Sequence, residues 1–86
     1  MKNIKILDVV AILTPISITR LTLLEPEYTC ISSLPTGQVG TVVEVYETEK
    51  EHQYLVEFAD RQGREYAMAI LKEDELLVLQ YELQVA

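Results

Sequence analysis

The 86-residue chain is 49% hydrophobic and 24% charged, and its 14 acidic against 7 basic residues give it a net charge of −7. This length predicts one domain spanning residues 1–86, and the composition is that of a globular chain. The acidic balance argues against nucleic acids and anionic membrane surfaces as partners, because Lys and Arg side chains hold both. It favours a basic protein partner or simple solubility.

The chain contains a single cysteine, Cys30, which excludes an intrachain disulfide and a cysteine-based metal cluster. The apolar run that follows the N-terminal residues 1–5 is broken by Asp8 without a small-residue cleavage site, so we do not interpret it as a signal peptide. No apolar run approaches the roughly 18 residues of a membrane span. We therefore expect a cytoplasmic protein that does not enter a membrane.

The first predicted strand covers residues 6–13, because this run is rich in β-branched residues and Thr14-Pro15 ends it. Residues 14–36 are predicted to form a long irregular loop. Within it, alternating apolar residues indicate an extended arm, and these are Ile16, Ile18, Leu21 and Leu23. A loop of this length in a small domain is often functional or partly disordered.

The clearest predicted strand is residues 39–47, with Val39, Thr41, Val43 and Val45 on its inward face. The Gly37-Gln-Val-Gly40 segment before it is predicted to be the corner where the long loop returns to the sheet.

Three more strands follow, at residues 53–59, 64–71 and 76–83, and the tail comprises residues 84–86. A charged hairpin loop at 48–52 precedes the strand at 53–59, and a turn at 60–63 follows it. Residues 72–75 are predicted to form one 3₁₀ turn before the last strand. Five short antiparallel strands in so small a chain avoid exposed edges by curling up. The sequence thus predicts an all-β fold, a small five-stranded SH3-like barrel.

A family resemblance is carried by residues 7–13, 37–44, 54–58 with Gly63, and 76–79. These segments resemble a family of small bacterial proteins known as domain of unknown function 4926. The resemblance runs from about residue 6 to residue 79 and implies an SH3-like barrel. It implies no activity, cofactor or site residue. The chain departs from the family pattern at residues 16–33, where its first loop is longer.

Residues that could carry catalysis are few. His52 is the only histidine and lies in the predicted 48–52 loop, and no nucleophile motif surrounds Ser17, Ser32 or Ser33. We interpret Cys30 as a small apolar packing residue. We therefore predict no catalytic residue.

Acidic residues form two groups, one at Glu47, Glu49 and Glu51 and one at residues 73–75. Neither group matches an ordered calcium-binding loop, so we interpret both as solvated surface and predict no metal site. Gly37-x-x-Gly40 lacks a third glycine and leads into a strand, which excludes a dinucleotide fingerprint. No cofactor is predicted.

These observations predict a non-catalytic protein-interaction module. Its expected partner is another protein, and the net charge favours a basic one. A second copy of the chain in a homodimer is the other expected partner. In one specific form of this hypothesis, the chain is the acidic member of a toxin–antitoxin or immunity-type pair. The predicted interaction surface comprises Ile16, Ile18, Leu21, Leu23, Tyr28 and Tyr46.

Two other functions stay open. The Gly37-x-x-Gly40-x-Val42 pattern is similar to that of translation and transcription barrels, which predicts an RNA- or ribosome-associated SH3-like barrel as the alternative. A small enzyme of unknown chemistry is the further alternative. The five tyrosines could also form a groove for proline-rich peptides, although peptide-binding SH3 domains usually add a tryptophan and this chain has none.

Overall fold

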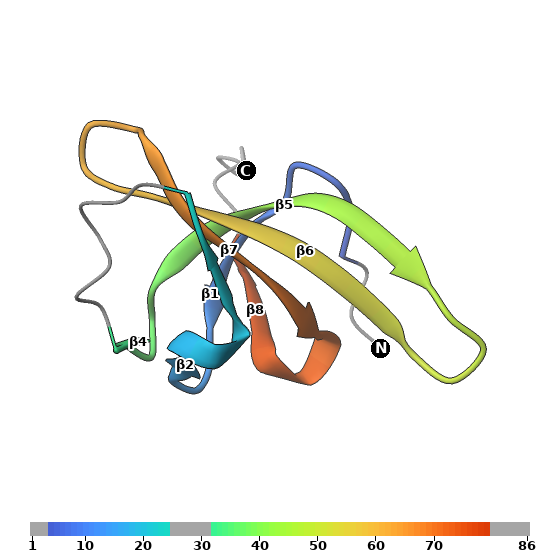
Figure 1. Ribbon diagram of the computed structural model, residues 1–86. Helices are drawn as coiled ribbons and strands as arrows, with labels where there is room; N and C mark the ends of the chain where they lie inside the picture. The colour runs from blue at the N-terminus through green and yellow to red at the C-terminus, as the bar shows by residue number, and fades with distance from the viewer. Residues whose placement is uncertain (1–3, 25–31, 80–86) are drawn as a thin grey trace, which may run out of the picture.

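The computed structural model describes residues 4–24 and 32–79, and its regular elements are strands and 3₁₀ turns (Figure 1). Six strands form one antiparallel sheet in the order β3-β7-β6-β5-β1-β8, and β2 and β4 form a separate pair. The strands are β1 (Val9–Ile12), β2 (Ile16–Ser17), β3 (Leu21–Leu23), β4 (Ser33–Leu34), β5 (Val39–Glu47), β6 (His52–Ala59), β7 (Glu65–Lys72) and β8 (Leu76–Leu79); the 3₁₀ turns are η1 (Ile18–Arg20) and η3 (Glu73–Glu75).

The all-β prediction is confirmed, and each predicted strand has its counterpart in β1, β5, β6, β7 and β8. The closed five-stranded barrel is not observed: the sheet has six strands, and β3 and β8 at its two ends are not paired with each other. The difference arises because the predicted irregular loop contains β2, η1, β3 and β4, and β3 extends the sheet by pairing with β7. Residues 80–86, which include the end of the predicted last strand and the tail, lie outside the described residues.

The inward face of β5 differs from the prediction. Gly40 and Val42 are buried, whereas Val39 is 42% exposed. The pairing register of β5 with β6 shifts between Val42 and Glu44, which is a β-bulge. One extra residue reverses the alternation, so that beyond the bulge Val45 packs against the core.

The core lies on one face of the curved sheet and draws on nearly every strand. Phe58, Ile12, Ile16, Leu71 and Leu76 are its largest fully buried side chains. The predicted alternation in β6 is confirmed, since Tyr54, Val56 and Phe58 are all buried. The small residues of β7, Ala67 and Ala69, are buried opposite Leu23 and Leu21 of β3. The described helical segments are three-residue 3₁₀ turns, too short to cross a membrane.

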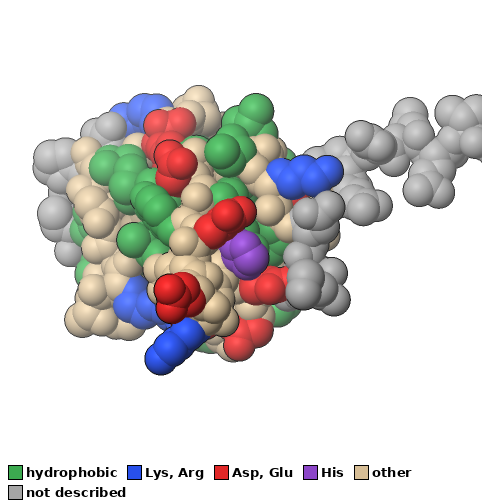
Figure 2. Space-filling view, turned by 90° about the vertical axis from the view of Figure 1, so that its right-hand side faces the viewer, with side chains coloured by type: hydrophobic (Ala, Val, Ile, Leu, Met, Phe, Trp, Pro, Cys, Tyr) green, Lys and Arg blue, Asp and Glu red, His purple; other side chains and the backbone are tan. Residues whose placement is uncertain are grey.

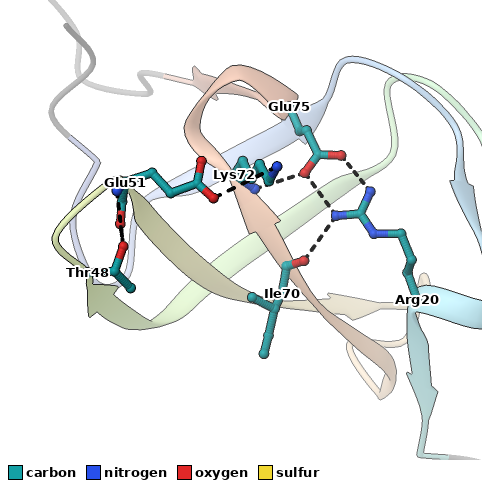
Figure 3. Close-up of polar contacts among 6 residues, drawn as sticks. All are labelled: Arg20, Thr48, Glu51, Ile70, Lys72 and Glu75. Carbon is teal, nitrogen blue, oxygen red and sulfur yellow. Dashed lines mark hydrogen bonds and ion pairs between the residues drawn. The ribbon is translucent and has the colours of Figure 1, made fainter.

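An ion pair joins η1 in the first loop to η3, the turn between β7 and β8 (Figure 3). Arg20 at the end of η1 donates to both carboxylate oxygens of Glu75, at 2.6 and 2.9 Å, and to the carbonyl oxygen of Ile70 at 3.2 Å. Glu75 also accepts from the backbone N–H of Lys72 at 2.9 Å. A bidentate pair of this kind fixes geometry as well as adding energy, so it holds η1 against β7 and η3.

Replacing Glu75 with Gln should make the stability less dependent on pH. The hydrogen bonds from Arg20, opposed by partial burial, hold the pKa of the Glu75 carboxyl below its usual value. The unfolded chain therefore binds this proton more readily than the folded chain does. The stabilisation that the ionised Glu75 carboxylate contributes is complete above the unfolded pKa of about 4.3, and it is lost as the pH falls through the folded pKa. We expect wild type to exceed Glu75→Gln by about 1 kcal/mol near pH 7, with the difference vanishing near pH 3, in urea unfolding. Glu44→Gln, on an exposed carboxylate of β5, is the matched control and should show no such convergence.

Candidate functional site

The structure separates the residues predicted to form an interaction surface. Ile16 is fully buried, which corrects its assignment to that surface. Leu21 and Leu23 are half-buried and pack against the core, because their partners on β7 are buried alanines. Ile18 is half-buried and Tyr46 is 39% exposed, and Tyr28 lies outside the described residues. Within the described part of the first loop, Ile16, Leu21 and Leu23 therefore contribute to the core.

A groove lies instead at the end of the molecule where the β5–β6 hairpin extends beyond the core (Figure 1). Its volume is about 920 Å³. The lining comes from the N-terminal segment, the hairpin and its loop, and the junction of β7 with η3: Ile4, Val45, Glu47, Thr48, Glu49, Lys50, Glu51, His52, Tyr54, Lys72, Glu73 and Asp74.

The floor of the groove is apolar. Tyr54 lies between Val45 and Leu71 in the register of β5, β6 and β7, so the three side chains share the core face of the sheet. Tyr54 is 3% exposed and Ile4 is 7% exposed, and both line the groove while belonging to the core cluster. The floor is thus held by the packing of the domain itself.

The rim of the groove is acidic. Five carboxylates line it, three from the hairpin at Glu47, Glu49 and Glu51 and two from η3 at Glu73 and Asp74, against the two lysines Lys50 and Lys72. The ammonium of Lys72 is 3.8 Å from a carboxylate oxygen of Glu51. Figure 2 looks onto this end of the molecule, where acidic side chains surround the histidine. The groove therefore carries a negative charge over an apolar base.

The hairpin loop has an ordered frame. The backbone N–H of Thr48 donates to the carbonyl oxygen of Glu51 at 3.2 Å, and the N–H of Glu51 donates to the hydroxyl of Thr48 at 3.0 Å. The Thr48 hydroxyl also contacts the Glu51 carbonyl (Figure 3). Beside the loop, the His52 ring stacks on Tyr54, with centroids 6.5 Å apart and planes at 26°. These contacts position the acidic side chains of the loop along the groove.

Tyr54 is the titratable group of the floor. Burial raises the pKa of its hydroxyl, and the nearby charges of Glu73 and Glu47 raise it further. The phenol is therefore neutral at physiological pH, and two rim carboxylates act on it, one from β5 and one from η3. Glu47 also lies 3.9 Å from Nε2 of His52.

The sequence-based prediction treated the acidic residues as two separate solvated groups and missed that they form one groove. The join is made by β6–β7 pairing, in which Gln53 lies opposite Lys72, so the end of β7 comes next to the start of β6. The available signal was the short predicted turn at 60–63 between two strands of similar predicted length, which brings the start of the first strand next to the end of the second. Within residues 4–24 and 32–79, no three His, Cys, Asp or Glu side chains are grouped closely enough to hold a metal ion.

Comparison with known proteins identifies one family. The family model described as "Domain of unknown function (DUF4926)" matches residues 6–78, which is most of the chain. No curated protein and no solved structure matches it. The matched region includes all but the last residue of the six-stranded sheet and all of the groove except Ile4. The chain belongs to the DUF4926 family.

Proposed function

We propose that this protein is a non-catalytic interaction module that binds a basic segment of a partner protein in the acidic groove. One observation carries the proposal: five carboxylates, from the β5–β6 hairpin and from η3, line a groove with an apolar floor, and two lysines line the same groove. Potentials of opposite sign steer partners together and select against acidic competitors. An apolar floor adds area for the aliphatic parts of Lys and Arg side chains.

The charge distribution supports a protein partner over RNA. Three of the described basic side chains are paired with acids: Arg20 with Glu75, Arg64 with Asp60, and Lys72 with Glu51. Nucleic acid binding depends on basic side chains that are available to phosphates. The specific partner that we propose is a basic toxin or effector, which this acidic protein would neutralise by binding it in the groove. We propose that this binding takes place in the cytoplasm.

The proposed fold class is a variant of the SH3-like barrel. Its support is the element order: a long first loop, the β5–β6 and β6–β7 hairpins, a 3₁₀ turn, and a last strand that pairs with β1. The bulge in β5 supports it further, because bulges bend strands where a sheet curls. The groove of this chain lies between the β5–β6 hairpin loop and the 3₁₀ turn η3.

Reversing two rim charges should weaken binding of a basic peptide strongly. The probe is fluorescein-labelled octa-arginine, followed by anisotropy at low ionic strength. Glu49→Lys/Asp74→Lys changes two rim side chains, and we expect about thirtyfold weaker binding, since each reversal replaces attraction by repulsion. The control is Glu44→Lys/Glu65→Lys, which changes the net charge equally on exposed side chains outside the groove.

The control variant should bind within about threefold of wild type, as expected for charges at a distance from the site in the presence of salt. Equal losses in the two variants would mean that the peptide responds to net charge alone, and the groove would not be the binding site. Absence of measurable binding to wild type would contradict a basic partner.

A further inference from the structure

The Tyr54 side chain is buried in the floor of the groove, and its hydroxyl makes no hydrogen bond in the described structure. The residue is 3% exposed, and its ring stacks with that of His52. No described side chain has a polar atom that is both enclosed and unpaired. The hydroxyl must therefore open into the groove, where it can donate or accept one hydrogen bond.

The surroundings of this hydroxyl define what it can bind. Glu47 at the end of β5 and Glu73 in η3 both act on it electrostatically and both line the groove. Val45 and Ile4 line the groove with the Tyr54 ring and make the floor apolar. A ligand that reaches the hydroxyl thus passes between carboxylates and rests on apolar side chains.

This arrangement suits an organic cation better than a metal ion. Among the described residues, no three His, Cys, Asp or Glu side chains form a group that could hold a metal ion. A guanidinium group is planar and carries five N–H donors, so it can donate to separate oxygens at once. Its three methylenes need an apolar surface, which Val45 and the Tyr54 ring supply.

We propose that the groove is an arginine-recognition site, in which the guanidinium of a partner's arginine donates to the Tyr54 hydroxyl and to the carboxylates of Glu47 and Glu73. The proposal rests on the proposed function, because it names the side chain that anchors the basic segment there. It assigns Tyr54 a recognition role in addition to its place in the core. The segment is a peptide with at least one exposed arginine.

Tyr54→Phe isolates the hydroxyl. The substitution leaves the ring, the packing and the net charge unchanged, and the hydroxyl has no hydrogen bond within the described structure to lose. We expect an unchanged melting temperature and about tenfold weaker binding of octa-arginine by titration calorimetry, the effect of losing one hydrogen bond to a charged group. Tyr46→Phe, at the 39% exposed tyrosine of β5, is the control and should bind as wild type does. Octa-lysine should bind wild type more weakly and should respond less to Tyr54→Phe.

The outcomes separate this inference from the proposed function. If Tyr54→Phe binds octa-arginine as wild type does while Glu49→Lys/Asp74→Lys loses it, the arginine anchor is wrong and the groove function stands. Equal losses for octa-arginine and octa-lysine in Tyr54→Phe would overturn arginine recognition. Wild-type protein with ¹³Cζ-labelled tyrosine gives a measurement without substitution: the Tyr54 signal should shift on adding octa-arginine, and an unmoved signal overturns the contact.

Discussion

Replacing Gly40 with Ala should destabilise the protein by about 3 kcal/mol, because no space exists for a side chain at this position. A Cβ added to Gly40 would lie 2.6 Å from Cγ1 of Val56, 2.8 Å from the carbonyl oxygen of Glu57 and 2.9 Å from Cδ1 of Phe58. One of these atoms is backbone of β6, directly paired with β5, so it cannot move without disturbing the ladder. Urea unfolding measures the loss.

Gly37→Ala is the matched control for this prediction. Gly37 has φ of +90°, and no atom lies within 4 Å of the position that a Cβ would take, so an added methyl group meets backbone strain but no clash. We expect a loss of about 1 kcal/mol, the usual penalty for a non-glycine residue in the left-handed region. If the two substitutions destabilise equally, close packing of β5 on β6 at Gly40 is not what the glycine provides.

The second large effect is expected at Ile16. Its side chain is fully buried in β2, so Ile16→Ala should destabilise the fold by about 3 kcal/mol through lost apolar burial and the cavity left behind. Ile70→Ala removes the same atoms from a side chain that is 48% exposed on β7, and should cost less than about 1 kcal/mol. Thermal and urea unfolding of both variants give the comparison.

This pair of variants distinguishes a packed first loop from a free arm. A loss for Ile16→Ala no larger than that for Ile70→Ala would show that β2 does not belong to the core. The Ile16 side chain would then be available to a partner, as the alternation of apolar residues in this loop first suggested. The structure instead predicts that substitutions here change stability before they change binding.

Five of the six strands of the sheet could be predicted from the sequence, and alternating side chains give the clearest signal. In β6, Tyr54, Val56 and Phe58 face the core and the intervening residues do not, so the two-residue period shows both the strand and its inward face. In β5, apolar side chains occupy both faces, and the period alone does not decide between them. The bulge after Val42 then reverses the alternation, which no local pattern of valines reveals.

The groove could not be predicted because it depends on contacts distant in sequence. Its hairpin carboxylates and those of η3 come together only through the pairing of β6 with β7. The same holds for Arg20 and Glu75, which are 55 residues apart and fix the first loop to η3. Composition did indicate the sign of the groove's charge, since acids outnumber bases two to one in the chain.

The most direct test of the groove's function is a titration of ¹⁵N-labelled wild-type protein with octa-arginine, followed by amide chemical shifts. We expect the shifts to concentrate at residues 47–54 and 72–74, which form the hairpin end and the η3 side of the groove. Residues of β1 and β8 should move little. Shifts centred on β1 and β8, or no shifts at peptide concentrations that saturate the anisotropy signal, would contradict binding in the groove.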